Sequence, residues 1–257
     1  SYEFLKQNIF LEKSDSQYNL QETIYTNNLL KAKEFFQELL LELSIKEVET
    51  IYTKVTQNLL FNIYSMSKEI DVHVSFETMN NRGKQLSHLE LLKNRLIYLS
   101  TKLNTDDFEK RSLRNSINEC WKTIYHQLGR NKNNPLDDDE FLFNHFIIFY
   151  GESLGDDHLS YLRRSRRMRG FSSHYQNYLL EDKFTTKSLT SSEGRLTLPE
   201  LYRYVSSIKS SVEKWYEISN PRDSSLDPEI VKWLEKIRRT GIEECMPLLM
   251  VSLQKIS

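Results

Sequence analysis

Apolar residues recur at intervals of three and four along most of this chain, which is the spacing of one face of an α-helix. Between residues 26 and 43 this pattern predicts a long helix, which carries paired Leu and Phe side chains. The same spacing predicts further helices over residues 48–59, 88–103, 106–128, 141–150, 198–218, 228–240 and 244–256. Only seven Gly and five Pro occur in 257 residues, so we expect long helices rather than a loop-rich β fold.

Several of these helices have an apolar face that we assign to a core. In 106–128 the inward residues are predicted to be Phe108, Leu113, Ile117, Trp121, Ile124 and Leu128. Gly129 then ends the helix in the position that favours a left-handed residue. The aromatic residues of 141–150, and Trp215 with Tyr216, are also expected to be buried.

Two segments depart from the helical period. Residues 60–66 and 70–77 are predicted to be short strands around 67–69, forming a β-hairpin that spans about 60–77. Within the second strand Val72, Val74 and Phe76 alternate with polar residues, which indicates a strand that is buried on one face.

A polar turn joins this segment to the helix that follows. Residues 80–83 read Asn-Asn-Arg-Gly, and the glycine can adopt positive φ. Ser87 is then predicted to cap the helix, with Glu90 completing a capping box and Leu86 and Leu91 forming a hydrophobic staple. Two interpretations stay open: the segment is an ordinary turn, or its N–H groups, amide and guanidinium bind an anion at the helix N-terminus.

The residues of this turn and helix resemble a signature of GmrSD-type proteins, which are modification-dependent restriction enzymes and related phage-defence proteins. The resemblance is densest over residues 21–104. The signature reads here Phe76-x-x-x-Asn80-x-Arg82-Gly83-x-x-Leu86-Ser87-x-x-Glu90-Leu91-x-Lys93.

The resemblance implies a ParB/sulfiredoxin-like domain that hydrolyses nucleoside triphosphate through an Asp-Gly-Gln-Gln-Arg motif, followed by an HNH nuclease domain. The chain contains no such motif, and its six His are scattered without the spacing of metal ligands. We therefore expect an internal or truncated piece of a larger protein, with both catalytic centres outside it. No catalytic residue, metal ligand or cofactor is assigned to this chain; nucleoside triphosphate with a divalent metal belongs to the full-length protein.

The resemblance also assigns roles to the residues of the signature. Asn80, Arg82, Gly83 and Lys93 become candidates for a nucleotide pocket. The structural positions of the motif are Phe76, Leu86, Ser87 and Glu90.

The expected fold is mainly α, a helical bundle-like body whose hairpin and capped helix are the remnant of an α+β ParB/sulfiredoxin-like domain. Residues 1–130 would be the distal part of that NTPase domain, with the signature at 76–94. Residues 131–257 would form an all-helical domain, since the polar segment 130–135 resembles a linker.

Composition is that of an ordinary globular protein, with 39% hydrophobic and 28% charged residues. A net charge of −1 excludes a uniformly basic coat for nucleic acid but allows a local basic patch. Cys120 and Cys245 are expected to be reduced and buried within helices. No apolar run approaches the ~20 residues of a membrane span, so we expect no membrane partner and a cytoplasmic location.

A run of arginines near aromatic residues is the second candidate for function. Its cations can bind nucleic-acid phosphates, or they can form a solvated helix face paired with nearby acidic residues. The candidates for contact with DNA are Arg163, Arg164, Arg166, Arg167 and Arg169.

Isolated titratable residues give weaker signals. His145 lies in an apolar helix and is expected to be a core histidine rather than a ligand. The carboxylates Asp71, Glu77 and Glu90 raise the hypothesis of paired acid–base catalysis, but Glu90 already serves the capping box.

Two functions remain from different classes. In the first, the chain is a non-catalytic part of an NTP-responsive restriction or phage-defence protein, contributing to a nucleotide pocket and coupling it to a nuclease domain or to DNA. In the second, it is a helical scaffold or protein-interaction module with no nucleotide role.

Overall fold

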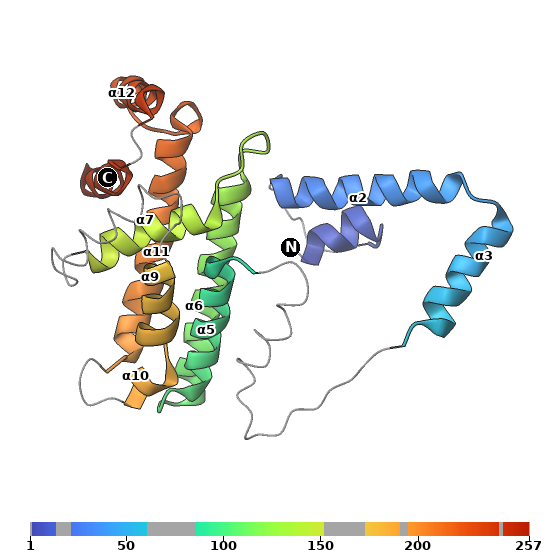
Figure 1. Ribbon diagram of the computed structural model, residues 1–257, viewed down its shortest axis with the longest axis horizontal. Helices are drawn as coiled ribbons and strands as arrows, with labels where there is room; N and C mark the ends of the chain where they lie inside the picture. Colours follow the sequence, from blue (N-terminus) through green and yellow to red (C-terminus); the bar gives the residue numbers. More distant parts are fainter. Residues whose placement is uncertain are drawn as a thin grey trace. The chain divides into compact units, whose positions relative to one another are not determined.

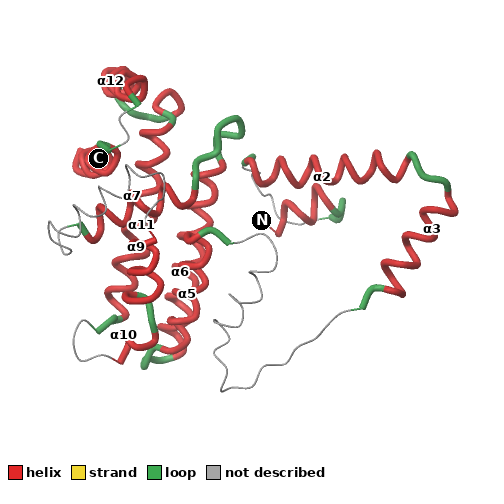
Figure 2. Tube along the Cα trace, viewed as in Figure 1, coloured by secondary structure: helices red, strands yellow, loops and turns green. Residues whose placement is uncertain are grey.

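The structure is a computed structural model that describes residues 2–13, 22–60, 86–151, 173–190, 195–241 and 244–256. Within these ranges all regular structure is helical, and Figure 2 shows helices and loops without a strand. The mainly α prediction is therefore confirmed. The predicted hairpin falls on residues that lie outside the described ranges, apart from Leu60.

Two compact units account for the chain. One comprises residues 1–71 with 129–135, and the other comprises 72–128 with 136–257. This division differs from the predicted boundary at residue 130, because helices on both sides of that position share one hydrophobic core. The segment expected to be a linker belongs instead to the first unit.

The first unit is built from helices with little core between them. Its helices are α1 (Tyr2–Phe4), the π-helix η1 (Leu5–Ile9), α2 (Ile24–Leu41), α3 (Ile45–Thr53) and the π-helix η2 (Lys54–Asn58). The Lys33 ammonium donates to the carbonyl oxygen of Asn8 at 2.7 Å, which ties α2 to η1. The α2 pattern correctly predicted a helix, yet Phe35 and Phe36 are each 59% exposed.

Gly129 belongs to this unit and ends α6 (Asp107–Gly129). Its φ does not lie in the left-handed region, so the predicted reason for a glycine here is wrong. A Cβ at this position would lie 2.6 Å from Cε2 of Tyr25, which shows that close packing requires the glycine. The left-handed glycine is Gly241, at the end of α12 (Pro228–Thr240).

The second unit holds the hydrophobic core. Its helices are α5 (His88–Lys102), α6, α7 (Asp138–Tyr150), α9 (Ser173–Asn177), η3 (Tyr178–Lys183), α10 (Thr186–Thr190), α11 (Leu198–Ser219), η4 (Pro221–Asp223), α12 and α13 (Met246–Ile256). In Figure 1, α5, α6 and α11 run in the same direction of the view and α7 runs across them. Helix α7 contacts α5, α11 and α13.

The sequence of α7 explains its central position. Phe141, Leu142, Phe143 and Phe146 are four apolar side chains on different sides of the helix, and all are at most 4% exposed. A helix that is apolar all round must be covered on every side. The predicted core residues of α6 are also buried from Leu113 onward, whereas Phe108 is 73% exposed, so its inward assignment is wrong.

Candidate functional site: a polar junction of three helices

Ser87 caps α5 as the sequence predicts. Its Oγ accepts from the N–H of Glu90 at 3.3 Å, and Oε2 of Glu90 accepts from the N–H of Ser87 at 3.0 Å. Leu86 and Leu91 are both half-buried. The helix of the signature is therefore a continuous element from His88 to Lys102, with its first turn held by its own side chains.

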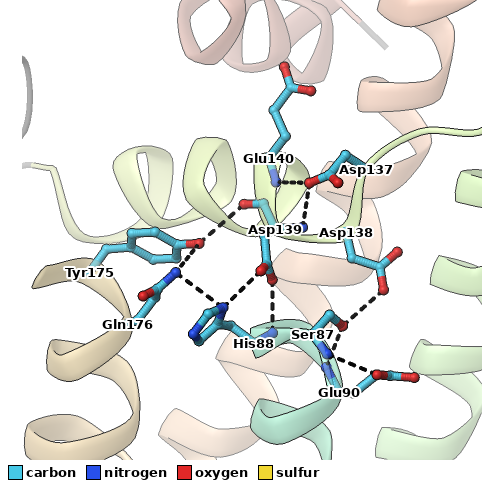
Figure 3. Close-up of polar contacts among 9 residues, drawn as sticks. All are labelled: Ser87, His88, Glu90, Asp137, Asp138, Asp139, Glu140, Tyr175 and Gln176. Carbon is cyan, nitrogen blue, oxygen red and sulfur yellow. Dashed lines mark hydrogen bonds and ion pairs between the residues drawn. The ribbon is translucent and has the colours of Figure 1, made fainter. Parts of the chain in front are cut away.

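A second helix begins next to this cap. Asp137 caps α7 and accepts from the N–H groups of Asp139 and Glu140 at 3.0 and 2.8 Å. The side chains of Asp138 and Asp139, in the first turn of α7, extend toward α5 (Figure 3). Two helix N-termini therefore meet, and each has carboxylates that offset its partial positive charge.

Three hydrogen bonds join the two helices (Figure 3). The Ser87 hydroxyl donates to Oδ2 of Asp138 at 3.0 Å. The backbone N–H of His88 donates to Oδ1 of Asp139 at 2.9 Å, and Nδ1 of His88 lies 2.8 Å from Oδ2 of the same carboxylate. Since a carboxylate only accepts, the proton in the last contact belongs on Nδ1 of His88.

Helix α9 closes the junction from another side. The Tyr175 hydroxyl donates to the carbonyl oxygen of Asp139 at 3.4 Å, and the Gln176 amide donates to that hydroxyl at 3.3 Å. The Gln176 amide nitrogen also lies 3.1 Å from Nδ1 of His88. Because Nδ1 carries its proton toward Asp139, the amide is oriented by the tyrosine hydroxyl rather than by the imidazole.

Burial and like charges act together on Asp138. Partial burial raises the pKa of the Asp138 carboxyl, and the neighbouring carboxylates Glu90, Asp137 and Asp139 raise it further. The hydrogen bond from Ser87 acts in the opposite direction. The junction is thus an acidic cluster in which ionisation of Asp138 is disfavoured.

The geometry does not form a catalytic triad, although Ser87, His88 and Asp139 are of the appropriate types. In a triad the serine hydroxyl bonds the imidazole that the aspartate orients. Here the Ser87 hydroxyl donates to Asp138, and the described contacts of the His88 imidazole are with Asp139 and Gln176 rather than with a serine hydroxyl. The arrangement binds helix ends together.

The N-terminus of α5 is also not vacant for an external anion. Asp139 accepts from the N–H of His88, and the capping box uses the N–H groups of Ser87 and Glu90. The anion that the sequence led us to expect at this helix end is supplied in part by the protein's own carboxylate.

Of the remaining predicted site residues, Lys93 lies within the described ranges and the others do not. Lys93 lies on α5 with its ammonium 5.7 Å from the ring centre of Tyr125, a cation–π contact with α6. Several predicted residues lie outside the described ranges, so their roles stay predictions: Phe76, Asn80, Arg82, Gly83, Arg163, Arg164, Arg166, Arg167 and Arg169.

His145 is a core histidine, as predicted. Its Nδ1 lies 3.0 Å from Oγ of Ser211, which also accepts from the Gln254 amide at 3.4 Å. The tautomer of the imidazole decides whether Nδ1 or the Ser211 hydroxyl donates, and Nε2 has no hydrogen-bond partner in the described part of the chain. Burial lowers the pKa of His145 to about 3, so the ring is neutral at physiological pH.

A groove of about 890 Å³ lies between α6 and α11. The Cys120 thiol borders it and donates to the carbonyl oxygen of Val205 at 3.3 Å. Burial raises the pKa of this thiol to about 12, and a thiol that keeps its proton is a poor nucleophile. Cys245 is half-buried and precedes α13, so the prediction that it is buried inside a helix is wrong.

Comparisons with known proteins give no relative: no family of proteins, no curated protein and no solved structure matches the chain. Among the described residues, no group of three or more His, Cys, Asp or Glu side chains is arranged to hold a metal ion. None of the described helices is long and apolar enough to span a membrane.

Proposed function

We propose that the chain is a non-catalytic part of an NTP-responsive defence protein of the GmrSD type, in which α5 couples a nucleotide pocket to the helical body. The pocket would use Asn80, Arg82 and Gly83 of the signature turn, with Lys93 nearby. The proposal rests on the resemblance of residues 76–94 and on one structural observation, the hydrogen bonds from Ser87 and His88 to the first turn of α7.

The mechanism follows from the position of these bonds. Ser87 comes four residues after Gly83, so a nucleotide that orders the turn would change the position or the mobility of the first turn of α5. That turn is bonded to Asp138 and Asp139, and α7 beyond them fills the middle of the core. Coupling between the nucleotide pocket and the helical body requires an element whose conformation depends on both. In this proposal that element is the junction between the first turns of α5 and α7.

Hydrogen exchange on the full-length protein tests this coupling. Nucleotide should change the protection of the first-turn amides of α7, and Asp139→Asn should weaken that response with little change in nucleotide affinity. Thr197→Ala is the matched control, because it removes the cap of α11 for about 1 kcal/mol without touching the junction. An α7 response of unchanged size in Asp139→Asn, or no nucleotide binding at all, would contradict the proposal.

The N-terminus of α5, whose N–H groups are already bonded within the protein, favours a second candidate function. Since Asp139 and the capping box already use N–H groups of the first turn of α5, the junction suits a helical scaffold without a nucleotide role. Calorimetry on the double variant Asn80→Ala, Arg82→Ala separates the two. Unchanged nucleotide affinity in the folded variant would support the scaffold function. Weaker nucleotide binding without a fall in melting temperature would support the nucleotide pocket.

The proposed partners are the rest of the parent polypeptide or a nuclease domain, and DNA through Arg163–Arg169. Electrostatic contacts with phosphates weaken as salt rises. Replacing the five arginines by Gln should therefore lower both the affinity for DNA and its salt dependence.

A further inference from the structure

Helix α12 has two different faces. Leu234 is 4% exposed within the core, and Ile230 packs against the same core. The opposite face is exposed to solvent and carries Lys232, Trp233, Lys236 and Arg239. These four residues, which we call the α12 basic face, follow one another at steps of one, three and three along the helix, and so lie on one side of it. Figure 1 shows α12 following α11.

Trp233 is the aromatic residue of the α12 basic face and lies at one edge of it. It is 56% exposed, whereas the other two tryptophans, Trp121 and Trp215, are at most 2% exposed. The Lys236 ammonium lies 4.2 Å from the centre of the Trp233 ring, so a cation and an aromatic surface are presented together.

The cations of this face are not neutralised by ion pairs within the described residues. The acidic residues of α12 are Glu229 and Glu235, and Glu235 forms its ion pair with Arg222. No ion pair joins Lys232, Lys236 or Arg239 to a carboxylate in the described ranges. The nearby Glu235 carboxylate offsets part of the Arg239 charge, whereas the charges of Lys232 and Lys236 are available to an anionic partner.

We propose that the α12 basic face binds single-stranded nucleic acid, with Trp233 stacking on an unpaired base and Lys232, Lys236 and Arg239 contacting phosphates. Proteins that bind single strands combine cations along the backbone with aromatic rings that accept any base. The inference does not depend on the function proposed above, because it rests on α12 alone.

Neither the helix dipole nor a membrane surface accounts for this face as well as a nucleic-acid strand does. Basic residues favour the C-terminal end of a helix, but this effect acts in the last turn and leaves Lys232 and Trp233 unexplained. A helix that lies on a membrane needs an apolar face to insert. The apolar face of α12 is already packed against the core, and the open face holds a single aromatic ring.

Fluorescence titration of the 257-residue chain with a dye-labelled oligothymidine strand tests the proposal. Binding should quench tryptophan emission through Trp233, and Trp233→Ala should weaken it about tenfold. Replacing Lys232, Lys236 and Arg239 by Gln should reduce the dependence of log affinity on log salt by about 2. Melting temperatures should stay close to that of the wild type, because the replaced side chains are exposed.

The matched control replaces Lys31, Lys46 and Lys54 by Gln, which removes the same charge from exposed positions on α2, α3 and η2. This control should bind as the wild type does, and Trp233→Phe should keep most of the affinity because a ring remains. Binding that ignores Trp233→Ala, that is equally tight for the duplex of the same sequence, or that is surpassed by anionic phospholipid vesicles would overturn the proposal.

Discussion

His88 contacts Asp139 through two atoms: its backbone N–H donates to Oδ1 at 2.9 Å, and its Nδ1 lies 2.8 Å from Oδ2. One carboxylate thereby holds both the backbone and the side chain of the first residue of α5. The two residues are 51 positions apart in the sequence, and they fix the N-terminus of α5 against that of α7.

Replacing Asp139 should therefore destabilise the fold. Asp139→Ala leaves the N–H and Nδ1 of His88 without an acceptor, which should cost about 1–3 kcal/mol in the free energy of unfolding. Asp139→Asn keeps an acceptor for the N–H and should cost less. Urea unfolding measures both, with the exposed Asp182→Ala as control. A cost for Asp139→Ala no larger than for the control would show that the contact adds no stability.

Replacing Asp138, in contrast to Asp139, should stabilise the fold at neutral pH. Since its pKa is raised in the fold, the folded state holds the proton more tightly than the unfolded state, and stability falls as pH rises above the ordinary value of 3.8. Asp138→Asn removes this loss and keeps an acceptor for Ser87, so the variant should be more stable at pH 7. The gain should disappear below pH 3.8.

Thermal melting from about pH 3 to pH 7 checks this prediction. Asp137→Asn is the control, because asparagine caps a helix as well as aspartate does. A wild type more stable than Asp138→Asn at pH 7 would mean that the charge on Asp138 is favourable.

His145 should contribute to unfolding in acid. With a pKa of about 3 in the fold and an ordinary value of 6.5, the unfolded state binds its proton first as pH falls. The contribution of His145 to the free energy of unfolding is fully present above pH 6.5. It should then decline by up to about 1.4 kcal/mol per pH unit toward pH 3. His145→Phe should show a shallower decline over this window in urea titrations, whatever its absolute stability. Equal slopes would contradict the assignment.

The two cysteines should differ in reactivity. The thiol of Cys120 is buried and its pKa is raised to about 12, whereas Cys245 is half-buried. Iodoacetamide should therefore label Cys245 well before Cys120 in the folded protein, as followed by mass spectrometry. Cys245→Ser should leave almost no labelling until denaturant is added, and rapid labelling of that variant would show that Cys120 is accessible.

Local signals in the sequence predicted the helices and their caps well. Ser87 with Glu90 forms the expected capping box, and Thr197 with Glu200 forms a second one at the start of the predicted helix 198–218. Asp227 caps α12, which starts at Pro228 as expected. Each of these motifs depends on residues three or four positions apart, so its geometry is contained in a short piece of sequence.

Relations between distant segments could not be predicted in this way. The sequence shows Ser87-His88 and the acidic run 137–139 as separate helix starts, and nothing in either indicates that they face each other. Phe108 fits the apolar spacing of α6. It lies in the first turn of that helix, beside the groove toward α11, and none of the described helices covers it. Periodicity describes one helix at a time, and burial depends on its neighbours.

The all-round apolar surface of α7 has a consequence for the order of events during synthesis. Residues 138–150 leave the ribosome before α11 and α13, two of the helices that cover them. Until those later helices arrive, the nascent chain exposes a stretch of adjacent aromatic and aliphatic side chains. Such a stretch suits chaperones that hold unfinished proteins, and we expect α7 to be the part of this chain that they bind first.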